Sequence, residues 1–148
     1  LPRGWMHTAL QEFARDPTLV SLSGPYRYYD HPKFKKFIAE LLWRLFAPST
    51  YFFIRYMVLG GNFVVKRKAL AKIGGFDTAI AFYGDDTNLA RRLHSVGRVR
   101  FLMKFFVYSS GRRLVAEGLL KSYLTYALNF LWQIFFRKSF THRYRDIR

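Results

Sequence analysis

Apolar residues recur at helical spacing in three stretches of the chain, which predicts three helices with one apolar face each. The stretches are residues 5–14, 33–46 and 114–136. We expect Pro48 to end the second helix, because a proline inside a helix removes a backbone hydrogen bond and clashes with the preceding turn. The third helix is expected to bend near Gly118.

Short apolar runs between these stretches predict strands. Residues 19–22 are expected to be a buried strand and residues 63–65 a short strand, and residues 98–108 alternate imperfectly, which indicates strand structure. The aromatic and polar segment 26–32 is expected to be a loop. The mixture of strands and helices predicts an α/β fold.

Glycines and acidic residues mark the boundaries of two more helices. A helix at residues 66–73 is expected to end at Gly74–Gly75, the usual C-terminal glycine signal. Another helix is expected to begin with Asp85 or Asp86 as its N-cap and to end at about Val96.

The charge of the chain restricts its partners. The 148 residues contain 25 Lys and Arg against 9 Asp and Glu, a formal net charge of +16, with 51% hydrophobic residues and 0 cysteines. Such an excess favours anionic lipid, nucleic acid or a phosphate-rich substrate. Nucleic acid is disfavoured because no recognisable binding motif accompanies the charge, and an anionic membrane surface is preferred. A chain without cysteine has no disulfide or thiolate metal site, which is compatible with a reducing compartment.

Two segments are candidates for contact with a membrane. Residues 33–46 form a basic amphipathic helix, which is typical of membrane surfaces; the alternative is an ordinary surface helix packed on the core. The longest uncharged stretch, Ser122 to Phe136, has about 15 residues, fewer than the roughly 20 that a bilayer span needs. We therefore expect an interfacial or core helix there, followed by a basic tail.

Asp85 and Asp86 are the strongest candidates for chemistry. They follow Gly84 at the start of a predicted helix, whose partial positive charge stabilises carboxylates. The aromatic residues Phe82 and Tyr83 would wall the pair from water and raise one pKa toward the range of a general base. The structural alternative is a helix N-cap without chemistry.

Two other segments have the composition of a substrate site. Gly60-Gly61-Asn62 combines glycines, which let a ligand approach the backbone, with an amide that offers a donor and an acceptor; the alternative is a tight turn. Arg112 and Arg113 form an arginine pair that can clamp a diphosphate; the alternative is a solvated basic loop. The four histidines are not at metal-ligand spacing, so no metal site is predicted within the chain.

The motif Gly84-Asp85-Asp86-Thr87-Asn88-Leu89, followed by Arg91-Arg92-Leu93, resembles a motif of family 2 glycosyltransferases, which are inverting enzymes of the GT-A type. The family motif reads Glu-Asp-Thr-Asp-Leu and then Arg-Leu, and its Asp takes the proton from the acceptor hydroxyl. The resemblance gives Asp86 the position of the base and Asp85 the position of the supporting Glu. Asn88 stands where the family usually has Asp.

Other segments extend this resemblance over nearly the whole chain. Gly61 and Asn62, with Lys66 and Arg67 after them, are similar to the turn that lines the acceptor side of the family's cleft. Residues 73–77 resemble the family's Gly-Gly-Phe-Asp turn, which is chiefly structural. Arg112 and Arg113 resemble a Ser-x-Arg-Arg segment that faces the nucleotide diphosphate, and residues 2–24 resemble the segment after the metal-binding Asp-x-Asp strand.

The resemblance implies that residues 1–113 are the C-terminal half of a GT-A domain and that residues 114–148 are a membrane-interfacial helix with a basic tail. We expect a fragment that lacks the N-terminal nucleotide-binding half and is inactive alone. The parent enzyme would transfer a sugar from a nucleotide-diphosphate sugar to a hydroxyl of a glycan or lipid-linked acceptor, at the cytoplasmic face of a membrane. The implied divalent metal, Mg²⁺ or Mn²⁺, would have its ligands upstream of Leu1. The alternative is a non-catalytic, basic, membrane-peripheral binding module.

Overall fold

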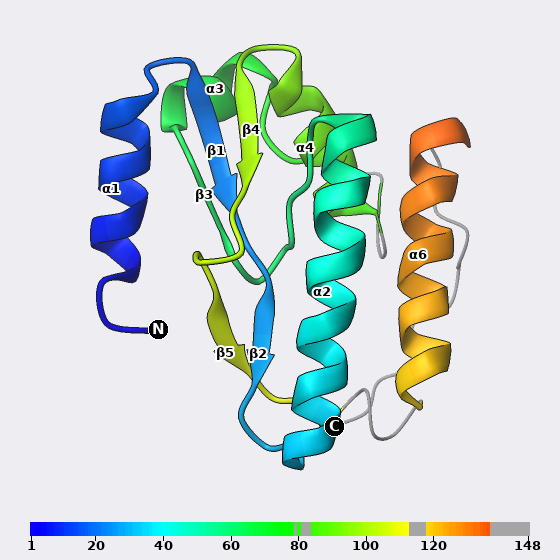
Figure 1. Cartoon of the computed structure of the whole chain (residues 1–148). Helices are drawn as coiled ribbons and strands as arrows, with labels where there is room; N and C mark the ends of the chain where they lie inside the picture. Colours follow the sequence, from blue (N-terminus) through cyan, green and yellow to red (C-terminus); the bar gives the residue numbers. More distant parts are fainter. Residues whose placement is uncertain (79, 81–83, 113–117, 137–148) are drawn as a thin grey trace.

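The computed structural model describes residues 1–78, 80, 84–112 and 118–136, and it has a mixed α/β fold with two small sheets (Figure 1). In the three-stranded sheet, β1 (Leu19–Ser23) is central, antiparallel to β3 (Phe63–Val65) and parallel to β4 (Arg98–Phe101). In the second sheet, β2 (Tyr26–Tyr28) pairs in parallel with β5 (Val107–Ser109). The predicted α/β class is confirmed.

Helices surround these sheets, with α1 to their left and both α2 and α6 to their right in Figure 1. The helices are α1 (Trp5–Arg15), α2 (Lys33–Ile54), α3 (Arg67–Lys72), α4 (Asp85–His94) and α6 (Leu119–Phe136). The predicted helices at 5–14 and 66–73 are confirmed, since each end of α1 and α3 lies within one residue of the prediction. The α3 helix ends as expected, with the Gly75 N–H donating to the carbonyl of Leu70 at 3.0 Å.

The main core lies where α3 and α4 pack on the three-stranded sheet. Its buried residues come from β1, β4, both helices and the segment before β3: Val20, Val58, Ala69, Leu89, Ala90, Leu93 and Val99. A second cluster joins α1 to the sheet through Ala9, Leu22 and Phe105. Since Leu89 and Leu93 are almost fully buried, this core fixes the position of α4 and of the two aspartates at its start.

Pro48 does not end α2, so that prediction is wrong: the helix continues for another six residues to Ile54. Contacts with β4 on both sides of the proline explain why. The Trp43 ring lies 6.1 Å from the Phe101 ring, and the Tyr51 hydroxyl donates to the carbonyl of Val99 at 2.8 Å. These tertiary contacts compensate for the hydrogen bond that Pro48 cannot make.

Three other expectations are corrected in detail. The predicted loop at 26–32 begins with β2, because Tyr26 to Tyr28 find a partner in β5. The predicted strand at 98–108 is divided into β4 and β5 by a turn, in which the Phe105 N–H donates to the carbonyl of Leu102 at 3.0 Å. The last predicted helix is observed as α6 from Leu119, directly after Gly118, whose φ of 84° is outside helical space, while its predicted first residues, 114–117, lie outside the described residues.

Candidate active site

Asp86 lies in the first turn of α4, where the Gly60–Gly61 turn approaches it. The Gly60 N–H donates to Oδ2 of Asp86 at 3.3 Å, and the Thr87 N–H donates to Oδ1 at 2.8 Å. The Thr87 hydroxyl is also within 3.4 Å of Oδ1. Two of the segments that the sequence singled out, 60–62 and 84–89, therefore meet at one carboxyl group.

Gly84 determines how this carboxyl is presented. It is the N-cap residue of α4, with φ 99° and ψ 0°, a left-handed conformation that glycine adopts without a steric penalty. The prediction that Asp85 or Asp86 is the N-cap is therefore wrong, because both are already helical residues. Asp85 is exposed and Asp86 is partly buried, so the two neighbours have different environments.

The pKa of the Asp86 carboxyl is raised to about 6, first by burial and second by the negative charge of Asp85. The hydrogen bonds from Thr87 and Gly60 act in the opposite direction without cancelling the rise. A carboxyl with this pKa is ionised at neutral pH and still binds a proton readily, which is what a general base requires. The expected rise in pKa is confirmed, while Phe82 and Tyr83, expected to cause it, lie outside the described residues.

Tyr26 of β2 is a neighbour of this carboxyl that the sequence analysis missed. The Gly61 N–H donates to the Tyr26 hydroxyl oxygen at 2.8 Å. Burial is the largest cause that raises the pKa of the Tyr26 phenol, and the negative charge of Asp86 adds to it. The phenol therefore stays protonated at neutral pH, and its hydroxyl can donate to a bound oxygen atom. Its place in an aromatic segment gave no signal for this role.

Gln133 of α6 is a second neighbour that the sequence analysis did not single out. Its side chain lies against Gly84, where an added Cβ would be 3.4 Å from the Cγ and Oε1 atoms of Gln133. The residue is 1% exposed, and neither Nε2 nor Oε1 has a hydrogen-bond partner among the residues that the structure describes. A buried amide without partners is costly, so Gln133 marks a polar position next to the Asp85–Asp86 turn that a ligand or water would satisfy.

Asn62, predicted to contact a substrate, is engaged inside the protein. Its Nδ2 donates to the carbonyls of Gly24 at 3.0 Å and Phe105 at 2.7 Å, and its Oδ1 accepts from Trp5 Nε1 at 3.0 Å. The residue is 1% exposed. Asn62 therefore joins α1, β3 and the two segments that precede β2 and β5, and it supports the Gly60–Gly61 turn from behind instead of offering its amide to a ligand.

Other residues of the resemblance also have structural contacts. Lys66 lies at the far end of β3 from Gly61, and its Nζ donates to the carbonyl of Pro17 at 3.0 Å. Arg67 is exposed at the start of α3. Arg92 donates through Nη2 to the carbonyl of Ile73 and thereby ties α4 to the glycine turn after α3. These three residues are not brought to the Asp86 carboxyl.

Arg112 lies beyond the end of β5, and its predicted partner Arg113 is outside the described residues. The segment before Arg112 is held by Asp30, which accepts from the Gly111 N–H at 2.7 Å and from the Ser110 hydroxyl. Ser109 at the end of β5 pairs with Tyr28, two residues along β2 from Tyr26. The exposed Arg112 therefore follows the strand pair that carries Tyr26, and its N–H donates to the Ser110 hydroxyl oxygen at 3.3 Å.

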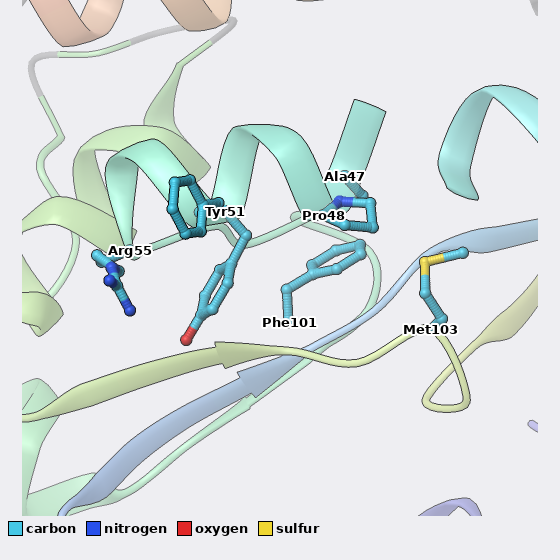
Figure 2. A pocket seen from close by; sticks show the side chains of 7 residues that line it. Ala47, Pro48, Tyr51, Arg55, Phe101 and Met103 are labelled. Atoms are coloured by element: carbon cyan, nitrogen blue, oxygen red, sulfur yellow. The ribbon is translucent and has the colours of Figure 1, made fainter. Parts of the chain in front are cut away.

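A pocket of about 350 Å³ lies elsewhere, between the second half of α2 and β4 (Figure 2). Its lining is apolar and aromatic apart from one cation: Ala47, Pro48, Tyr51, Phe52, Arg55, Phe101 and Met103. None of the predicted site residues that the structure describes lines it. Since none of the described lining residues is acidic, this pocket is suited to holding an apolar group and not to proton transfer.

The described residues contain no group of three or more His, Asp or Glu side chains that could hold a metal ion. Comparisons with protein-family models, curated proteins and solved structures find no match to this chain. The motif residues and the geometry around Asp86 therefore carry the functional argument by themselves.

Proposed function

We propose that this chain is the acceptor-side half of an inverting, GT-A-type family 2 glycosyltransferase, with Asp86 as the general base. The observation that carries the proposal is the Asp86 carboxyl itself: its pKa of about 6, its orientation by the Gly60 N–H, and its place in the motif that resembles the family's base. The mixed sheet is compatible with half of such a domain, because β1 and β4 pair in parallel and α4 lies between these two strands in the order of the chain.

In this proposal, the chain supplies the proton acceptor and its support. The acceptor hydroxyl gives its proton to Asp86 as its oxygen forms a bond to the anomeric carbon of the donor sugar. The bond from that carbon to the nucleotide diphosphate breaks on the opposite face, and the diphosphate leaves with the electron pair. The Gly60 N–H holds one oxygen of Asp86 in place, and the charge of Asp85 keeps the carboxyl basic enough to accept the proton.

The groups that would bind the acceptor, the diphosphate and the metal belong partly to this chain and partly to the parent enzyme. The Tyr26 hydroxyl, fixed by the Gly61 N–H, would donate to an oxygen of the acceptor. Arg112, with Arg113, would contact the diphosphate. The divalent metal implied by the resemblance would neutralise charge on the leaving diphosphate and would be held by residues outside this chain.

The test is activity of the full-length protein with a panel of UDP-, GDP- and dTDP-sugars and a lipid extract as acceptor, measured as release of nucleoside diphosphate. Asp86→Asn should lower kcat by at least about a hundredfold, since it removes the proton acceptor. Asp85→Asn keeps the base but removes the second cause of its raised pKa, so the acidic limb of the pH–rate profile should move to lower pH. An Asp86→Asn enzyme with unchanged kcat would disprove the proposal.

A second candidate function is a basic, membrane-peripheral module without catalysis. It is favoured by the net charge of +16 and by the apolar side chains that α2 exposes. In that case Asp86→Asn would change nothing that is measured with nucleotide sugars, and a membrane-binding assay would be the only one to respond.

A further inference from the structure

The amphipathicity of α2 is inverted with respect to the protein core. Its large apolar residues at positions i, i+3, i+7, i+11 and i+18 share one helical face, and all are exposed: Phe34, Phe37, Leu41, Leu45 and Phe52. The residues that α2 buries against the sheets are small, Ala39 and Ala47. A surface helix of a soluble domain normally turns its apolar stripe inward, so this outward stripe requires a partner.

The α6 helix has the same inversion. Four of its exposed apolar residues follow the spacing i, i+4, i+7 and i+11: Leu124, Leu128, Leu131 and Phe135. The side chains that α6 buries include the polar residues Asn129 and Gln133. Both helices lie to the right of the sheets in Figure 1, whereas α1 lies to the left. Two helices with inverted faces on one side of the sheets indicate a single apolar environment there.

Cationic side chains accompany the α2 stripe. Lys33 is on one flank of the stripe by helical position and Lys35 is on the other, and both are exposed; the exposed Arg44, on the flank of Lys33, is paired with Glu40 at 2.8 Å. Long cationic side chains at the borders of an apolar stripe reach lipid headgroups while the stripe enters the acyl region. The net charge of +16 makes an anionic bilayer favourable and makes pairing with a second copy electrostatically unfavourable.

The length of α2 raises the question of whether it crosses the membrane. It is the one helix among the described residues that is long and apolar enough to do so by length and composition, and 11% of its most apolar window is buried in the protein. However, both halves of α2 are attached to the sheets. Oε1 of Glu40 lies 3.7 Å from Nη2 of Arg27 in β2, and the Tyr51 hydroxyl donates a hydrogen bond to the carbonyl of Val99 in β4. A helix held to the folded domain at both halves crosses a bilayer only if these contacts break, so docking in the plane of the membrane is the arrangement that keeps them.

We propose that the outward face of α2, together with that of α6, docks in the plane of an anionic bilayer and is the membrane-contact surface of this protein. The inference deepens the membrane association expected for the proposed function, since a glycosyltransferase held in this way is presented with lipid-linked acceptors. It does not depend on Asp86, so loss of transferase activity and loss of membrane binding are separate outcomes. It also extends the contact from residues 33–46, one of the two segments that the sequence offered, to the whole length of α2.

The test uses the full-length protein and vesicles of phosphatidylcholine alone or with 30% phosphatidylglycerol, a composition we choose to vary charge. Because this chain has 0 cysteines, Leu41→Cys introduces a single labelling site in it for an environment-sensitive fluorophore. Leu10→Cys on α1, where Leu10 is 63% exposed, is the matched control. We expect a blue shift and quenching by spin-labelled lipid at position 41 with the anionic vesicles, and neither at position 10.

Flotation of unlabelled variants provides the second measurement. The double variant Phe37→Glu/Leu45→Glu should bind anionic vesicles at least about tenfold more weakly, because it removes two inserted side chains, while Leu10→Glu should bind as the parent does. The proposal is overturned if position 41 does not respond to vesicles, if phosphatidylglycerol makes no difference, or if position 41 responds to protein concentration without lipid, which would indicate a second copy. Preferential binding to nucleic acid over anionic vesicles would also overturn it.

Discussion

The backbone N–H of Gly60 donates to Oδ2 of Asp86 across 26 positions of sequence, at a distance of 3.3 Å. This contact joins a tight turn before β3 to the first turn of α4. The hydrogen bond fixes the position of one carboxylate oxygen of Asp86, and burial of the same carboxyl group contributes to its raised pKa. The two segments were each recognisable as candidates in the sequence, but their meeting at one atom is a property of the fold.

Asp86→Asn should stabilise the protein at neutral pH and not at acidic pH. The folded-state pKa of about 6 is above the ordinary value of 3.8, so the folded carboxyl keeps its proton over a range in which the unfolded one has lost it. Folding stability therefore decreases as pH rises from about 4 to about 6, and the full penalty remains above that range. Asparagine carries no charge, so the variant should gain up to about 3 kcal/mol at pH 8 and almost nothing at pH 3.5.

Urea unfolding at the two pH values measures this difference directly. Asp85→Asn is the control: it relieves only the second cause of the raised pKa and should give a smaller gain in the same direction. An equal change in stability at pH 3.5 and pH 8 would mean that the environment of Asp86 does not disfavour its ionised form.

Gly61→Ala should be more damaging than Gly60→Ala. A Cβ at position 61 would lie 2.6 Å from the Tyr26 hydroxyl oxygen, whereas a Cβ at position 60 would make an ordinary contact at 3.9 Å with Asp86. We expect a loss of about 1–3 kcal/mol for Gly61→Ala, the usual range for overpacking, and less than about 1 kcal/mol for Gly60→Ala. Thermal unfolding of both variants measures the difference.

Tyr26→Phe distinguishes the hydroxyl clash from a general intolerance at position 61. Removing the hydroxyl leaves the ring carbons as the nearest atoms, at 3.3 Å, so the double variant Gly61→Ala/Tyr26→Phe should be more stable than the sum of the single changes predicts. Strict additivity would show that the Tyr26 hydroxyl does not limit space at Gly61.

Much of the fold was predictable where the local pattern and the tertiary contacts agree. The buried strand at 19–22 and the glycine stop after α3 follow from short apolar runs and turn residues, and both are observed. The continuation of α2 through Pro48 and the pairing of β2 with β5 depend on contacts between residues that are distant in sequence, such as Tyr51 with Val99. For the same reason Tyr26 and Gln133 could not be assigned to the site from the sequence, since no local signal relates them to Asp86.

Asn62 variants should lose stability before they lose function. Its side chain bonds to two buried backbone carbonyls and to the partly buried Trp5 indole, so Asn62→Ala removes the partner of all three groups and should cost about 2–4 kcal/mol. Trp5→Phe is the graded comparison, because it removes one of these partners and leaves the carbonyl bonds intact. If Asn62→Ala instead raised KM at unchanged thermal stability, the amide would have a substrate-binding role as first predicted.

Gln133→Leu should separate stability from function at the side of the site where α6 contacts Gly84. Leucine has a similar volume and no polar atoms, so it removes a buried amide that has no partner in the described structure, and the variant should be more stable by about 1–2 kcal/mol. Natural chains retain such a destabilising group mainly where a ligand or water uses it. We therefore expect the stabilised variant to show a higher KM for the acceptor, measured beside its melting temperature. Gln133→Glu is the matched polar change, and it should destabilise the site by placing a third carboxylate near Asp85 and Asp86. A Gln133→Leu protein that is less stable than its parent would mean that the amide is already satisfied in solution.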